Sequence, residues 1–79
     1  MNDRRSYELR SSPQRDSRLY SVKSLIEANI LVLKEETNLL LDYVVGVAGH
    51  KSFIDEIEDN IAQMAEYRSM LETIEKDFK

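Results

Sequence analysis

The chain has 79 residues, a formal net charge of −4 and no cysteine. A chain this short forms one domain, whose core supplies only about 3–5 kcal/mol of stability unless something else reinforces it. The absence of cysteine excludes disulfides and thiolate metal sites. The acidic excess lies in residues 19–79, with six basic and twelve acidic side chains, and a body of that charge repels nucleic acid.

Two further features bear on where the protein works. No apolar run approaches the roughly 18 residues that a membrane span needs. The first residues, Met1 to Arg5, are not followed by the apolar segment of a secretory signal. The sequence therefore predicts an acidic, cytoplasmic protein with no membrane span.

Residues 1–16 are polar and include the only proline, Pro13. Such a segment buries too little apolar surface to offset its ordering entropy, so we expect a largely flexible arm in front of a helical body over 17–79. Five arginines lie in and directly after this arm, and arginine binds carboxylates and phosphates well. The candidates for contact with an acidic partner are Arg4, Arg5, Arg10, Arg15 and Arg18.

A long helix is predicted over about residues 17–48. No proline or glycine interrupts the stretch from Ser17 to Val45, and Asp16 or Ser17 can cap its start. Gly49 suits the left-handed position that ends a helix. Residues spaced by three or four form one seam, comprising Val22, Ile26, Ile30, Leu33, Thr37, Leu40, Val44 and Val47.

A second apolar stripe runs beside this seam. It comprises Leu25, Val32, Leu39 and Tyr43, and Leu41, Val45 and Ala48 widen its far end. The helix thus carries more apolar surface than one partner helix covers. An arc of this width is typical of a helix inside a bundle of three or four helices.

A second helix is predicted over about residues 52–78. Ser52 and Asp55 have the spacing of a capping box, and Lys76 and Lys79 stand at the end, where the helix dipole favours positive charge. The opposite face is polar and should contact water. Its single apolar stripe comprises Phe53, Ile57, Ile61, Met64, Tyr67, Leu71, Ile74 and Phe78.

The short connection between the two predicted helices makes them antiparallel neighbours. The predicted fold class is therefore all-α, an antiparallel two-helix hairpin. Because a lone hairpin leaves one flank of the first helix in water, we expect it to complete a four-helix bundle, either by dimerisation or by docking on a partner.

The sequence offers little for chemistry. His50 is the only histidine and falls in the predicted turn, and Val47 stands where a Glu-x-x-His metal motif needs glutamate. No glycine-rich phosphate loop, calcium loop or nucleophile–base pair is present. We therefore predict no catalytic, metal or cofactor-binding residue and no enzymatic activity.

The pattern favours a small protein–protein interaction module, such as a regulator, an adaptor or a small chaperone. Its partner is a second copy of the chain, another helical protein, or both. The residues predicted to form the interface are Leu25, Ile30, Val32, Leu39, Tyr43, Met64, Leu71 and Phe78. The alternative is a dimeric regulator that binds nucleic acid through the arginine-rich arm.

Overall fold

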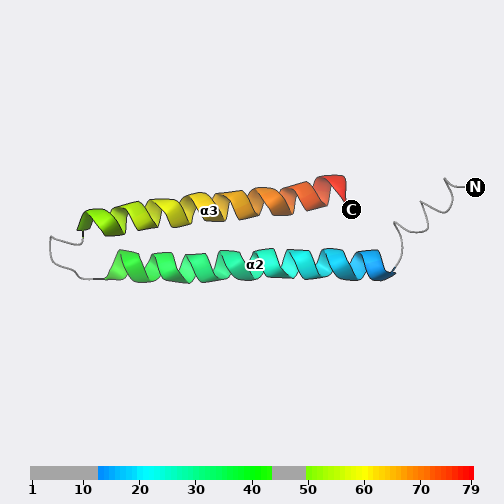
Figure 1. The fold of residues 1–79 in the computed structure, drawn as a ribbon, viewed down its shortest axis with the longest axis horizontal. Coiled ribbons are helices and arrows are strands. Elements are labelled where there is room, and N and C mark those ends of the chain that lie inside the picture. Colours follow the sequence, from blue (N-terminus) through cyan, green and yellow to red (C-terminus); the bar gives the residue numbers. More distant parts are fainter. Residues whose placement is uncertain (1–12, 44–49) are drawn as a thin grey trace, which may run out of the picture.

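The computed structural model describes residues 13–43 and 50–79. These residues form two helices, α2 (Pro13–Asp42) and α3 (His50–Asp77), which lie side by side along most of their length (Figure 1). The helices are antiparallel, so the start of α2 and the end of α3 share one end of the molecule, the open end. The predicted all-α hairpin is confirmed, while completion of a four-helix bundle by a second molecule stays a prediction.

Helix α2 begins at Pro13, earlier than the predicted start near Ser17. Proline is favoured at the first helical position because its missing N–H would lack an intrahelical partner there anyway. The helix ends at Asp42, and Tyr43 is already non-helical, so the predicted continuation to residue 48 is wrong at this point. Two β-branched residues and a glycine follow in sequence, and all three lower helix propensity. The remaining predicted end and the Gly49 cap lie outside the described residues.

Helix α3 begins at His50 and includes Ser52, so the prediction of a turn at His50 and of a cap at Ser52 is wrong. Glycine is accepted before the first helical residue, and Gly49 has that place in the sequence. At the other end, Lys76 lies in the last turn, as predicted, and favourably opposes the negative end of the helix dipole.

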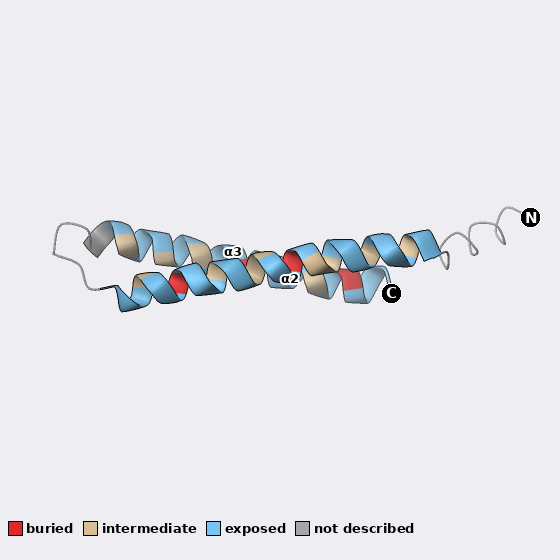
Figure 2. Ribbon diagram, turned by 90° about the horizontal axis from the view of Figure 1, so that it is seen from below, coloured by how far each residue is buried: buried red, intermediate tan, exposed pale blue. Residues whose placement is uncertain are grey.

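The two helices meet along one line of contact, here called the inner seam (Figure 2). Its members are buried or half-buried and recur every three or four residues. Of the described residues, Ile26, Met64 and Ile74 are the buried apolar ones, at 7–9% exposed, and no side chain is fully buried. The inner seam comprises Leu19, Lys23, Ile26, Ile30, Leu33, Thr37 and Leu40 of α2, and Phe53, Ile57, Asn60, Met64, Tyr67, Leu71 and Ile74 of α3.

Three described residues of the seam predicted for α2 and the stripe predicted for α3 lie outside the inner seam, and one of them is Phe78, which follows the end of α3 and is 47% exposed. Val22 is 48% exposed and its neighbour Lys23 is half-buried. Likewise Ile61 is 53% exposed and its neighbour Asn60 is half-buried. In both cases the polar residue, Lys23 or Asn60, stands at the position that continues the heptad repeat of the surrounding seam residues. Lys23 is accommodated because its aliphatic stem can lie along the seam while its ammonium reaches Glu75 across it, at 4.0 Å.

A polar layer interrupts the apolar seam. Two contacts between the helices define how they are aligned: Tyr43 with Phe53 near the connection, and Lys23 with Glu75 near the open end. With this alignment, Thr37 of α2 lies level with Asn60 of α3. Thr37 is only 5% exposed, but its hydroxyl donates a hydrogen bond of 2.7 Å to the carbonyl oxygen of Leu33. The Nδ2 of Asn60, in contrast, is buried and has no hydrogen-bond partner. Such a group lowers stability, although polar seam residues also fix register.

Replacing Asn60 by leucine should therefore stabilise the hairpin. Removing a buried, unsatisfied donor is expected to raise the free energy of unfolding by about 1–3 kcal/mol. Thermal unfolding followed by circular dichroism at one protein concentration measures the change. Asn38→Leu is the control, since Asn38 is exposed on α2 and its replacement should change stability by less than about 0.5 kcal/mol. A lower midpoint for Asn60→Leu would show that this amide stabilises the fold.

Candidate protein interaction surface

Among the described residues, exposed apolar side chains form a stripe along α2 and its C-terminal end. Its apolar members are well exposed, reaching 64% for Leu25 and 71% for Leu39. Between them lie two polar residues, the half-buried Asn29 and the exposed Glu36. We call this set the outer stripe, and it comprises Val22, Leu25, Asn29, Val32, Glu36, Leu39 and Tyr43.

The outer stripe repeats the spacing of the inner seam, one residue earlier. Leu25 directly precedes Ile26, Val32 precedes Leu33, and the other pairs follow the same rule up to Leu40. One residue corresponds to a rotation of about 100° in an α-helix. Helix α2 therefore presents two heptad surfaces roughly at right angles, and α3 covers only one of them.

Helix α3 has no equivalent surface. The residues that directly precede its inner-seam residues are all exposed, and Met70 is the single apolar one among them. They are Ser52, Glu56, Asp59, Gln63, Glu66, Met70 and Thr73. The polar, water-facing side predicted for this helix is thus confirmed, and on this side of the hairpin the apolar residues of α2 lie beside polar and acidic residues of α3.

The structure separates the predicted interface residues into two groups. Leu25, Val32, Leu39 and Tyr43 lie on the outer stripe, and Phe78, just beyond α3, is 47% exposed. In contrast, Ile30, Met64 and Leu71 lie in the inner seam, where the hairpin itself covers them. Contact of any of these residues with a second molecule stays a prediction.

A second group of exposed apolar side chains lies outside the outer stripe, and the sequence predicts only its member Leu41, at the far end of the apolar arc. The group includes Ile54 and Ile61 of α3, 52% and 53% exposed, and Leu31 and Leu41 of α2. Ile61 lies one residue beyond the heptad position held by Asn60, so its side chain is exposed although the sequence predicts it in the seam. The members of this group are divided between the two helices, whereas the apolar members of the outer stripe follow one another along α2.

The predicted arginine contacts are only partly visible. Arg4, Arg5 and Arg10 lie outside the described residues. Arg15 donates a hydrogen bond of 3.1 Å from Nη2 to the carbonyl oxygen of Phe78, across the open end, and Arg18 is exposed. Arg15 therefore binds within its own chain, and nucleic-acid binding by the arm rests on the sequence alone.

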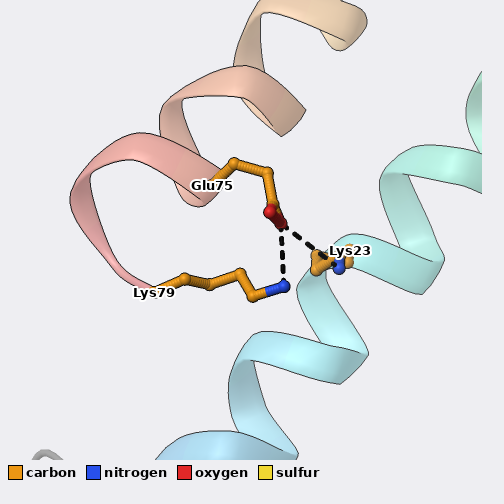
Figure 3. A network of polar contacts seen from close by, with 3 residues as sticks. All are labelled: Lys23, Glu75 and Lys79. Carbon is orange, nitrogen blue, oxygen red and sulfur yellow. Dashed lines mark ion pairs between the residues drawn. The ribbon is translucent and has the colours of Figure 1, made fainter.

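Three charged residues form a network near the open end (Figure 3). The Oε1 of Glu75 lies 3.0 Å from the ammonium of Lys79 and 4.0 Å from that of Lys23. The hydrogen bond from Lys79 lowers the pKa of the Glu75 carboxyl group, and the positive charges of Lys79 and Lys23 lower it further, while desolvation opposes them. All three side chains contact solvent, so this network joins the helix ends but forms no enclosed site.

The described residues offer no site for a metal ion, since no three His, Cys, Asp or Glu side chains among them are grouped closely enough. Neither α2 nor α3 contains a stretch long and apolar enough to span a bilayer.

Comparison with known proteins gives no match: no protein-family model, curated protein or solved structure is similar to this chain.

The Glu75 network predicts a weak acid dependence of stability. The pKa of Glu75 is lower in the folded chain than in the unfolded one. The stability that its ionised carboxylate adds is therefore complete at pH values above the unfolded-state pKa, and it is lost as the pH falls through the folded-state pKa. Glu75→Gln should slightly lower the thermal midpoint at neutral pH, and this difference should vanish in acid. Glu72→Gln, on the same helix but outside the network, is the control. An equal difference at both pH values would contradict the assignment.

Proposed function

We propose that this chain is a small, non-enzymatic protein–protein interaction module that acts through the outer stripe of α2. The observation that carries the proposal is a second heptad surface that neither helix of the described residues covers. Regulators, adaptors and small chaperones of this kind use a folded scaffold to present an apolar surface to a partner.

The energetics support this proposal. Exposed apolar side chains scattered singly need no explanation, but five of them in register on one helix are a continuous hydrophobic surface. They are 48–71% exposed, and full burial of such a side chain is worth about 1.5–3 kcal/mol, so covering the stripe is worth roughly 5 kcal/mol. That amount matches the whole stability of a small domain.

The shape of the surface indicates the kind of partner. A straight row of side chains at heptad spacing fits another α-helix, whose side chains pack between them. A helix seated there would be the third member of a bundle, or the first contact of a four-helix bundle formed by two hairpins. The proposed function needs only apolar contact with a partner, so it involves no catalysis.

Replacing Leu39 by aspartate tests this proposal. Leu39 is 71% exposed, so the hairpin itself should keep its helix content. A carboxylate buried without a partner costs about 3 kcal/mol or more, so association should weaken by about 100-fold. Light scattering over a dilution series measures self-association, and cross-linking of the tagged chain in cell extract measures association with other proteins.

The matched control is Asn38→Asp, which adds the same charge at the neighbouring exposed residue, outside the outer stripe. This variant should associate like the unmodified chain. If Leu39→Asp also kept its mass in solution and all its cross-linked partners, the outer stripe would not be the interaction surface.

A further inference from the structure

The outer stripe reads the same in both directions. From Val22 to Tyr43 the order is two apolar residues, one polar, one apolar, one polar and two apolar. Val32 is at the centre, with Asn29 three residues before it and Glu36 four residues after it. A surface with this symmetry is complementary to a second copy of itself turned by 180°, which is the condition for a two-fold, isologous contact.

We propose that the outer stripe binds the outer stripe of a second copy, with the two α2 helices antiparallel and a two-fold axis beside Val32. This inference rests on the proposed function and identifies the partner. In this arrangement Leu25 faces Leu39 of the second copy, Val22 faces Tyr43, and Val32 faces its own counterpart.

The polar residues determine the direction of the contact. In the antiparallel pair, each Asn29 lies near Glu36 of the second copy, so its amide can donate a hydrogen bond to that carboxylate. A parallel pair would instead place the two Glu36 carboxylates against each other, and like charges at one level of a helix pair repel. The half-buried Asn29 and exposed Glu36 therefore favour the antiparallel arrangement.

The charges of α3 limit the contact to α2. In an antiparallel hairpin, residues that precede the seam residues of both helices lie on the same side. The contacts of Tyr43 with Phe53 and of Lys23 with Glu75 set Val32 level with Ala65, so the two-fold axis would also pass beside Ala65. If the four helices closed into a square bundle, Glu66 of one copy would therefore approach Glu66 of the other. Repulsion between these two carboxylates opposes closure, so the two α3 helices stay on the outside.

The extent of the contact indicates its strength. The stripe extends over 22 residues, from Val22 of α2 to Tyr43 just beyond it, which is about 32 Å. A contact of this length and about 10–12 Å wide belongs to the small class below about 1,200 Å² of total buried surface. Interfaces of this class are weak and reversible. The dimer should therefore dissociate on dilution through the micromolar range.

Single cysteines can test the arrangement, because the chain has none of its own. Facing residues of two packed helices have Cα atoms about 4–6 Å apart, within the range for a disulfide. Val32→Cys alone should form a disulfide-linked dimer on mild oxidation. Leu25→Cys alone and Leu39→Cys alone should not, since each would lie about 21 Å from its counterpart, but a mixture of the two should form a mixed dimer.

Substitutions of Asn29 give a second test without covalent bonds. Asn29→Lys should tighten the antiparallel dimer roughly fivefold to tenfold, because lysine then faces Glu36 of the second copy, and Asn29→Asp should weaken it by a similar factor. Sedimentation equilibrium measures both. In a parallel dimer, both variants would place like charges together and both would weaken association.

The outcomes separate this inference from the proposed function. Disulfides from Leu25→Cys alone and Leu39→Cys alone would show a parallel dimer and overturn the inference. So would a purified chain that stays monomeric at millimolar concentration. If that monomer bound a different helical protein and lost it in Leu39→Asp, the outer stripe would remain an interaction surface with another occupant. If Leu39→Asp changed no association at all, the proposed function itself would fail.

Discussion

The contact between α2 and α3 is a single seam, and this constraint determines the rest of the molecule. Two helices side by side can each cover only one side of the other, so no side chain among the described residues becomes fully buried. Helix α3 places most of its large apolar side chains in this seam, and Ile54, Ile61 and Met70 are exposed outside it. Helix α2 has two apolar surfaces, and the hairpin leaves the second one in contact with water. The asymmetry between the helices is thus a direct result of placing these two sequences in one seam.

The inner seam combines packing with selection of register. Lys23 and the Thr37–Asn60 level have polar side chains at positions that apolar residues would fill more stably. Both features restrict how α2 can shift along α3. A shift would separate Lys23 from Glu75, and it would place Thr37 or Asn60 opposite an apolar side chain. In the dimer proposed above, Asn29 and Glu36 would have the same effect on the outer stripe, because they favour one direction of pairing. Both surfaces of α2 carry polar residues at positions where apolar ones would give more apolar contact.

Much of this architecture can be predicted from the sequence, and the errors have physical causes. Periodicity predicts both helices and their antiparallel packing, because Ile26, Leu33, Met64 and Ile74 recur at heptad spacing. It also predicts the excess surface through Leu25, Val32 and Leu39. It fails at Val22 and Ile61, where the nearest apolar residue was chosen over the position that the heptad requires. Whether Ile30 or Leu71 faces its own hairpin or a partner is a question of rotation about the helix axis, which composition does not encode.

The antiparallel seam also has a consequence for how the chain folds. Contacts near the connection, such as that of Tyr43 with Phe53, join residues close in sequence, whereas the bond from Arg15 to Phe78 closes a loop of more than sixty residues. Loop closure becomes entropically costlier as its length grows, so the helices should pair first near the connection and then zip toward the open end. Unfolding should run in the opposite order, with the Arg15 and Lys23 contacts opening first. The open end is thus where backbone amides should exchange their hydrogens with solvent soonest.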